Sequence, residues 1–166
     1  MKSSQGKRRT RKEADVMSMP NQQAADLLSL ICENADMTGI GDAGGLRGSA
    51  VAGSLYGSLY TADPGETGDQ TTNECAYTSY ARVAITRAGA SWNVAVADPA
   101  TAKNAAAVTF PACTGAPETA THFGVGTVAL PGAGKLLFSG PLAVPLAISA
   151  GVTPEFAIDQ MVLTAD

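Results

Sequence analysis

The chain contains 166 residues, of which 45% are apolar, 16% are charged and only 5% are aromatic, and its formal net charge is −4. A chain of this length is typical of one domain, whose core is large enough to be stable without disulfides or bound metals. Its three irregularly spaced cysteines and single histidine predict neither a disulfide framework nor a zinc site. No apolar run reaches the ~18 residues of a membrane-spanning helix, and the basic N-terminus lacks the apolar segment of a signal peptide, so we expect a soluble protein that is made inside the cell and has reduced thiols.

Residues 1–17 form a basic N-terminal arm with six basic and two acidic side chains. The resulting +4 leaves −8 for the rest of the chain, so the arm precedes an acidic body. The arm is polar and has no apolar periodicity, which predicts an extended segment that becomes ordered on a partner. Such cations can bind nucleic acid or an acidic protein surface, and the acidic body and the lack of interleaved aromatic residues favour the protein surface. The expected contact residues of the arm are Lys7, Arg8, Arg9, Arg11 and Lys12.

Residues 18–36 predict an amphipathic helix over about 20–35. Pro20 stands near the expected first turn, where its fixed backbone angle is tolerated. The apolar residues that recur at helical spacing are Ala24, Leu27, Leu28, Ile31 and Ala35. This stripe is expected to pack on the body or on a neighbouring subunit, and Leu27, Leu28 and Ile31 join the arm as predicted contact residues.

The glycine-rich connection over residues 37–53 contains a formal G-x-G-x-x-G pattern in Gly39, Gly41 and Gly44. A dinucleotide site needs a strand before this pattern and a helix after it. Here a helix precedes the pattern and more glycines follow it. The connection is therefore interpreted as a linker between the helix and the body.

Residues 54–166 predict an all-β body. The predicted strands are 55–61, 77–87, 92–97, 105–110, 121–128, 135–140, 142–149 and 155–164, the last with a possible break. In the segment YTSYARVAITR, side chains of alternate residues fall on opposite faces, the period of a half-buried strand. Short strands separated by Gly and Pro favour an antiparallel β-sandwich, jelly-roll-like, over an α/β enzyme.

The loop over residues 62–76 gathers Asp63, Glu66, Asp69 and Glu74. Carboxylates of this kind can bind calcium or act as an acid and base pair. Their spacing does not match an EF-hand loop, and Asp63-Pro64-Gly65 is typical of a turn. The interpretation that we favour is a solvated loop between strands, with no metal.

The segment LPGAGKLLF, residues 130–138, looks like part of a phosphate-binding loop. A working loop has a glycine at the position of Ala129, a Ser or Thr at the position of Leu136, and a helix after it. The residues that follow predict a strand instead. We therefore expect a turn between two strands, and no nucleotide cofactor.

Three further residue types could carry chemistry. His122 is the single histidine, so any catalytic triad must include it, but no nucleophile motif accompanies it and it falls inside a predicted strand. The cysteines are interpreted as small apolar fillers. Trp92 is expected to cap the core; an exposed aromatic residue in a carbohydrate groove is the alternative.

Several segments together resemble a widespread group of small tailed-bacteriophage proteins, described as virion structural or tail-fibre-like proteins. The segments are AGSLYGSLYTADPGETGDQTTNECAYTSYARVAITR, NAAAVTFPACTG, ATHFGVGT, GAGKLLFSGPLAVPLAISAGVTPEFAI and LTAD. The resemblance covers about residues 38–166. It implies a structural protein of a phage particle, made in the host cytoplasm, with no cofactor and no catalytic residue.

The compact body, without internal repeats, and the basic arm lead to the hypothesis of a capsid decoration or cement protein on the capsid surface. Its expected partners are the major capsid protein and neighbouring copies of itself as a homo-oligomer; neither a membrane nor nucleic acid is expected as a partner. The first alternative is a tail-fibre or tail-associated host-recognition module that displays the 62–76 loop. The second is a hydrolase that uses His122 and an acidic neighbour.

Overall fold

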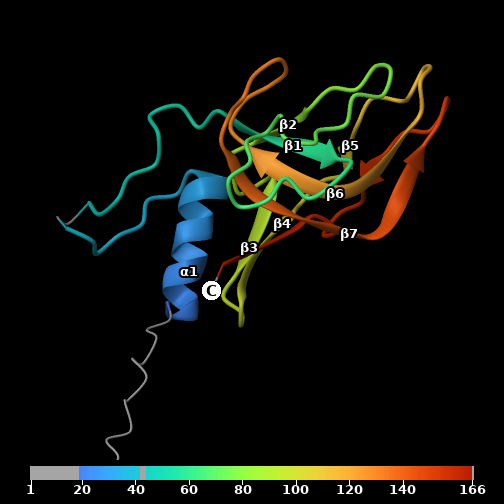
Figure 1. Ribbon diagram of the computed structural model, residues 1–166. Coiled ribbons are helices and arrows are strands. Elements are labelled where there is room, and N and C mark those ends of the chain that lie inside the picture. Colours follow the sequence, from blue (N-terminus) through green and yellow to red (C-terminus); the bar gives the residue numbers. More distant parts are fainter. Residues whose placement is uncertain (1–18, 42–43, 166) are drawn as a thin grey trace, which may run out of the picture.

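The computed structural model describes residues 19–41 and 44–165 (Figure 1). Helix α1 (Asn21–Leu28) continues directly into a π-helical turn, η1 (Ser29–Glu33). The strands that follow are β1 (Ser54–Tyr60), β2 (Val83–Thr86), β3 (Trp92–Ala95), β4 (Ala100–Asn104), β5 (Val108–Thr109), β6 (Glu118–Gly126), β7 (Leu136–Ile148), β8 (Glu155–Phe156) and β9 (Val162–Ala165). Within the described residues, neither the length nor the apolarity of any helix is sufficient to cross a membrane.

The predicted N-terminal helix is confirmed, and its ends have local causes. Pro20 occupies the N-cap with an extended backbone (ψ 143°), where the lack of an amide hydrogen carries no penalty. At the other end Asn34 adopts a left-handed conformation (φ 60°), which terminates the π turn. The Asn34 side chain then holds the next segment, because it accepts a hydrogen bond from the Ser49 amide (2.6 Å) and donates one to the Ser49 carbonyl (2.9 Å).

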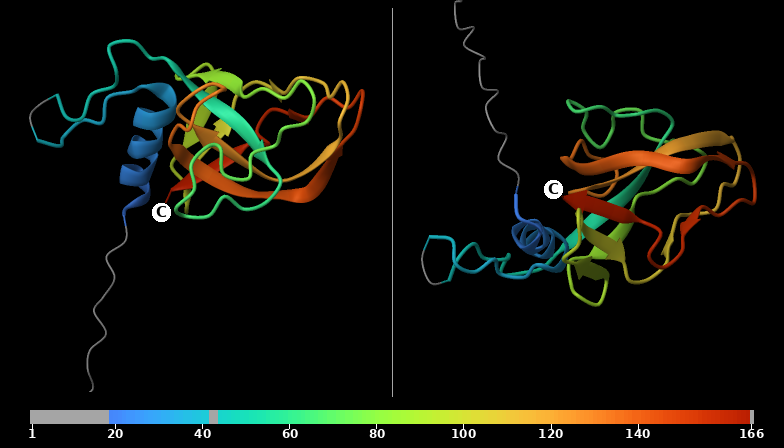
Figure 2. Two further views of the ribbon diagram at one scale, coloured as in Figure 1. Left: turned by 45° about the horizontal axis from the view of Figure 1, so that its top comes forward. Right: turned by 90° about the horizontal axis from the view of Figure 1, so that it is seen from below.

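Helix α1 shares one core with the β body. Its buried residues Ala24, Ala25 and Leu28 face β4 and β3, and the helix stands beside these strands in Figures 1 and 2. Trp92, at the start of β3, is 1% exposed and belongs to the same core cluster. The interpretation of Trp92 as a core residue is therefore confirmed, and the exposed-groove alternative is not.

The strands form three antiparallel sheets. The four-stranded sheet has the order β2-β1-β6-β7, the three-stranded sheet β3-β4-β9, and the two-stranded sheet β5-β8. The predicted antiparallel, mostly β architecture is confirmed, but the jelly-roll-like pair of sheets is not what these strands form. Strands β5 and β8 stay short because Pro111 follows the first and Pro154 precedes the second, and proline has no amide hydrogen to extend a ladder.

The predicted strand over 77–87 is only half formed. Residues 83–86 make β2, whereas Ser79 has a positive φ of 81° and the Tyr80 amide donates to the Tyr77 carbonyl (2.8 Å), so the chain turns. The alternating pattern placed these two tyrosines on opposite faces. The turn instead brings their rings into an edge-to-face contact with centroids 5.2 Å apart, a favourable geometry for aromatic pairs.

Two predicted strands, 135–140 and 142–149, are one long strand, β7. It runs through Pro141 and Pro145, which is possible because β7 is the edge of its sheet and one side of its backbone needs no partner. Its register with β6 jumps from Ala120 opposite Leu146 to His122 opposite Pro141. The intervening residues of β7 therefore bulge, and the Val144 side chain is 74% exposed.

Strand β4 lies outside the predicted strands. Its buried residues are Ala100, Ala102 and Asn104, and alanine and asparagine are uncommon in strands. Small side chains are needed here because α1 packs directly against this strand. The local sequence therefore does not predict β4, because the small residues that the packing of α1 requires are not typical of a strand.

The Arg87 guanidinium joins α1, the connection and the end of β2. Its Nε and Nη2 donate to the carbonyls of Ile31 and Leu30, each at 2.7 Å. Its Nη1 donates to the Ser49 hydroxyl (3.0 Å) and to the Ala52 carbonyl (3.1 Å). The last carbonyls of a helix lack intrahelical partners and carry partial negative charge, so this cation both caps the helix and fixes it to the body.

We expect Arg87→Ala to lower the free energy of unfolding by about 2–3 kcal/mol, because hydrogen bonds from a charged group contribute ~1.5–3 kcal/mol and their loss leaves carbonyls without donors. Urea denaturation measures the change. Arg87→Lys keeps the charge but not the planar fork of donors, so it should recover only part of the stability. An alanine variant as stable as the wild type would contradict the role of Arg87.

Candidate functional site

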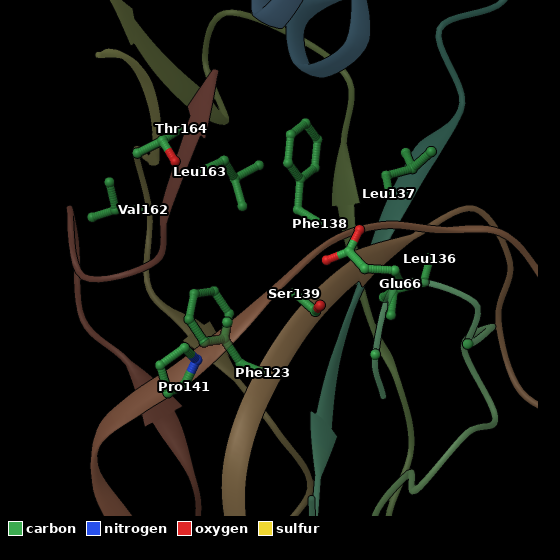
Figure 3. Close-up of a pocket in the computed structure, with 13 residues that line it drawn as sticks. Glu66, Phe123, Leu136, Leu137, Phe138, Ser139, Pro141, Val162, Leu163 and Thr164 are labelled. Carbon is green, nitrogen blue, oxygen red and sulfur yellow. The ribbon is translucent and has the colours of Figure 1, made fainter. Parts of the chain in front are cut away.

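A surface cleft lies between the edges of two sheets. One wall is β7, the last strand of the four-stranded sheet, and the other is β9, the last strand of the three-stranded sheet. The cleft has a volume of about 720 Å³. In Figure 3, Val162, Leu163 and Thr164 line one side and Phe138 with Leu137 the other.

The cleft combines aromatic and apolar side chains with a few polar groups. Phe123 of β6 and Pro141 of β7 lie at one end of the cleft, and the Glu66 carboxylate reaches in from the 62–76 loop (Figure 3). Glu66, Ser139 and Thr164 are exposed to solvent. This composition can hold an apolar side chain or an extended segment, with a carboxylate and two hydroxyls as hydrogen-bonding partners.

A second, more apolar cleft of about 630 Å³ adjoins the first and shares Phe123, Pro141 and Val162 with it. Its other lining residues include Leu142, Val144, Leu146 and Phe156. Several of these are half-buried at the margin of the core. Together the two clefts form one open face along β7, where the two sheets are not joined by hydrogen bonds.

The 62–76 loop that borders the first cleft is built from hydrogen-bonded turns. Asp63 accepts a hydrogen bond from the Gly65 amide (2.9 Å), so the predicted Asp-Pro-Gly turn is confirmed. The Asp69 carboxylate accepts from the Thr71 hydroxyl (2.6 Å) and amide (2.8 Å), which holds the pKa of Asp69 below its usual value. These carboxylates are therefore satisfied by local donors and are not gathered into one site.

Gln70 connects this loop to the 127–135 loop. Its Oε1 accepts from the amides of Thr127 (2.9 Å) and Val128 (3.0 Å), and its Nε2 donates to the Val128 carbonyl (3.3 Å). The side chain is 0% exposed. Gly126 and Gly134 are required beside it, because a Cβ at either position would collide with the Gln70 side chain.

A buried ion pair completes the contact between the two loops. The Arg82 guanidinium makes a bidentate pair with Glu74, with Nε to Oε1 and Nη2 to Oε2 both at 2.7 Å, and these side chains are 0% and 7% exposed. Arg82 Nη1 donates to the carbonyls of Val128 (3.0 Å) and Gly132 (2.8 Å). The hydrogen bonds that Arg82 donates to Glu74 raise the pKa of Arg82 above its usual value, so the guanidinium stays charged.

The LPGAGKLLF segment forms the predicted turn between strands, since β6 ends at Gly126 and β7 begins at Leu136. The Gly132 carbonyl of this segment, like the Val128 carbonyl just before it, accepts a hydrogen bond from the Arg82 guanidinium. Carbonyl oxygens repel a phosphate. Gly39 and Gly41 likewise do not begin a helix, because both residues have positive φ and lie between the two partners of an isolated bridge, Met37 and Leu46.

The remaining candidate residues have structural contacts. Thr121 donates its hydroxyl hydrogen to the Thr61 carbonyl (2.8 Å). The same hydroxyl oxygen lies 2.9 Å from Nδ1 of His122 and has no second hydrogen to donate, so His122 is the donor in that contact. His122 thus lies in β6 as predicted. Within residues 19–41 and 44–165, no three His, Cys, Asp or Glu side chains come together as a metal site.

The predicted contact residues fall into two groups. Lys7, Arg8, Arg9, Arg11 and Lys12 lie outside the described residues. Leu27 and Ile31 are half-buried on the helical segment, whereas Leu28 is 0% exposed in the chain's own core, where it packs on the β body and offers no surface to a partner.

The sequence reasoning missed the residues of the open face. Phe123 and Phe138 fall in predicted strands and Pro141 falls between two of them, and the sequence analysis gives none of the three a role. The signal that could have revealed them is charge: between Thr119 and Pro154 the sequence has one charged residue, Lys135. A strand with one solvated face normally alternates apolar and polar residues, and β7 does not.

In a comparison with protein families, the model described as "Podophage GP4 fiber I protein gp80" matches residues 44–164, which covers the strands β1 to β9 except for the last residue of β9 and leaves α1 outside. No curated protein matches the chain. The description names a fibre protein of a phage, so it supports the tail-fibre alternative better than the capsid-decoration hypothesis.

We expect Glu74→Gln to destabilise the fold by about 3–5 kcal/mol, because it leaves the buried Arg82 cation without its counter-charge. Release of the 127–135 loop should also speed tryptic cleavage after the exposed Lys135. Urea denaturation and limited proteolysis measure the two effects. Glu66→Gln, in the same loop but on the surface, is the matched control and should change stability by less than about 0.5 kcal/mol. Equal effects of the two variants would refute the ion pair's role.

The three cysteine thiols are expected to be unreactive in the folded protein. All three are buried, and burial raises the pKa of Cys32 and of Cys75 to about 12, so almost no thiolate forms at neutral pH. A maleimide should label none of them before denaturation and all three after it. Rapid labelling of the native protein would show that the core opens at one of these positions.

Proposed function

The chain belongs to the podophage GP4 fiber I protein gp80 family, a family of phage virion fibre proteins, and from this membership we propose that it is a fibre component on the tail of a phage particle. The observation that carries the proposal is the match over residues 44–164, which includes all of the strands of the body except for the last residue of β9. The body has no internal sequence repeat, so it suits a compact unit at an end or a joint of a fibre rather than an extended shaft. Its role is structural and not catalytic.

The N-terminal part of the chain supplies the attachment in this proposal. Residues 1–43 lie outside the family match, and they contain the basic arm and α1. A basic arm can follow an acidic protein surface, while the half-buried Leu27 and Ile31 leave apolar area beside it. Contact with the major capsid protein stays a prediction. The location of the chain on the particle tests it.

The copy number of the chain in purified particles tests the tail location. Quantitative mass spectrometry should give far fewer copies than the major shell protein, and antibody-gold labelling should mark the tail. A stoichiometry comparable to that of the shell protein would indicate a location on the capsid surface and would overturn the proposal.

Neutralising the arm should weaken attachment to the particle. In a variant with glutamine at Lys7, Arg8, Arg9, Arg11 and Lys12, we expect fewer copies per particle and a greater loss in high salt, because a charge-driven contact is screened. Circular dichroism should show an unchanged body. The control replaces Lys103 and Lys135 of the body by glutamine, and a loss of attachment as large as that of the arm variant would argue against the arm.

A further inference from the structure

The first cleft lies between two sheet edges, each of which has a partner strand on one side only within the described residues. Strand β7 is the last strand of the four-stranded sheet and β9 is the last strand of the three-stranded sheet. An edge strand presents unpaired amide and carbonyl groups, which are usually covered or paired. The part of β7 in the cleft wall, residues 136–140, contains no proline and can use these groups. The cleft therefore has the form of a site for an extended segment of chain.

Glu66 gives this site its charge. Its carboxylate reaches into the cleft beside Ser139 (Figure 3), and it is the one charged side chain of the lining. The other carboxylates of the 62–76 loop, those of Asp63, Asp69 and Glu74, accept hydrogen bonds from neighbouring groups. Within residues 19–41 and 44–165, the Glu66 carboxylate has no such donor. The cleft therefore offers a negative charge to a cation from outside the described residues.

Apolar and aromatic side chains surround this carboxylate. Phe123, Phe138 and Pro141 belong to the cleft lining, with Val162 and Leu163 on the β9 side. Arginine and lysine pack their aliphatic stems on surfaces of this kind, and a guanidinium or ammonium group is also attracted to an aromatic face. The cleft is thus better suited to a basic segment than to a purely apolar segment or to a polyanion.

The described part of the chain begins beside this cleft. Helix α1 contacts β9 as well as β3 and β4, and the end of β9 lies beside the start of α1 in Figures 1 and 2. Thr164 of β9 belongs to the cleft lining. The residues that precede α1 therefore start next to one end of the cleft.

The basic arm is long enough to reach Glu66. Its cations, from Lys7 to Lys12, precede Met19 by seven to twelve residues, which corresponds to about 25–40 Å of extended chain. A domain of this size has a radius of gyration of about 15 Å. A tether of this length keeps the arm at an effective concentration on the order of millimolar, so even a weak contact is occupied within one chain.

We propose that the first cleft binds the basic arm of its own chain, with an arm cation paired to Glu66. Val16 and Met17 follow the arm cations in the sequence, so they meet the apolar β9 side of the cleft next to α1. The arm carries +4 and the rest of the chain −8, and the two parts attract each other. A chain outside the particle then holds its attachment segment on its own body, and an acidic partner surface competes for it.

Cysteine cross-linking tests the contact in the full chain. The native cysteines are buried, so mild oxidation joins only added thiols. Thr10→Cys places a thiol among the arm cations, and Ser139→Cys places one in the cleft. We expect this pair to form a disulfide within one chain at least about tenfold faster than the control pair of Thr10→Cys with Val96→Cys, at a rate independent of protein concentration. Val96 is 58% exposed in the turn between β3 and β4, strands that also contact α1, and β9 lies on the other side of β4.

Proteolysis tests the charge of the cleft. Glu66→Gln should raise the rate of tryptic cleavage in the arm about threefold, because an arm cation loses its partner. High salt should have the same effect on the wild type, since it screens the pair. Asp98→Asn removes the same charge from an exposed position in the turn between β3 and β4, outside the cleft, and should leave the rate unchanged.

Three results would each overturn the proposal. They are equal cross-linking of the two cysteine pairs, a disulfide between two chains in place of one within a chain, and equal cleavage of the Glu66→Gln and Asp98→Asn variants. The second result would assign the cleft to the arm of another copy. The contact depends only on the arm and the body, so none of these results bears on the tail location, and a capsid location would leave the contact within the chain standing.

Discussion

The buried pair of Arg82 and Glu74 organises one end of the β body. Taking these charges out of water is costly, and the cost is offset only because the guanidinium also satisfies the carbonyls of Val128 and Gly132. The pair therefore ties two loops that are far apart in sequence to the start of β2. Gln70 adds neutral hydrogen bonds to the same loop. The turn into β7 is thus held in place, and with it the position of the strand that borders both clefts.

A second arginine holds the other end of the molecule. Arg87 directly follows β2, and its guanidinium donates hydrogen bonds to the carbonyls of Leu30 and Ile31 at the end of the helical segment, which holds α1 on β4. This close approach explains why Ala100 and Ala102 are small and fully buried. Both arginines come from one short segment around β2. The helix and the cleft loops are therefore positioned from the same strand, although they lie on different sides of the body.

The family of phage fibre proteins shares the β body, while the helix and the arm stand outside the matched residues. This division agrees with a body that has the architecture common to the family and an N-terminal part that is specific to one kind of phage particle. Within the body, the buried charges of Arg82 and Glu74 are satisfied by internal partners, whereas apolar side chains of β7 such as Val144 stay exposed.

The sequence by itself determined the N-terminal helix, the antiparallel β character, the turn at LPGAGKLLF and the resemblance to phage structural proteins, because each depends on local periodicity, local turn residues or a long ordered series of segments. It did not determine β4, the turn at Ser79, or the joining of two predicted strands into β7. Those features depend on what packs against each segment. The cleft was also beyond the sequence, because its walls, β7 and β9, come from different sheets and only the tertiary structure brings two such edges together.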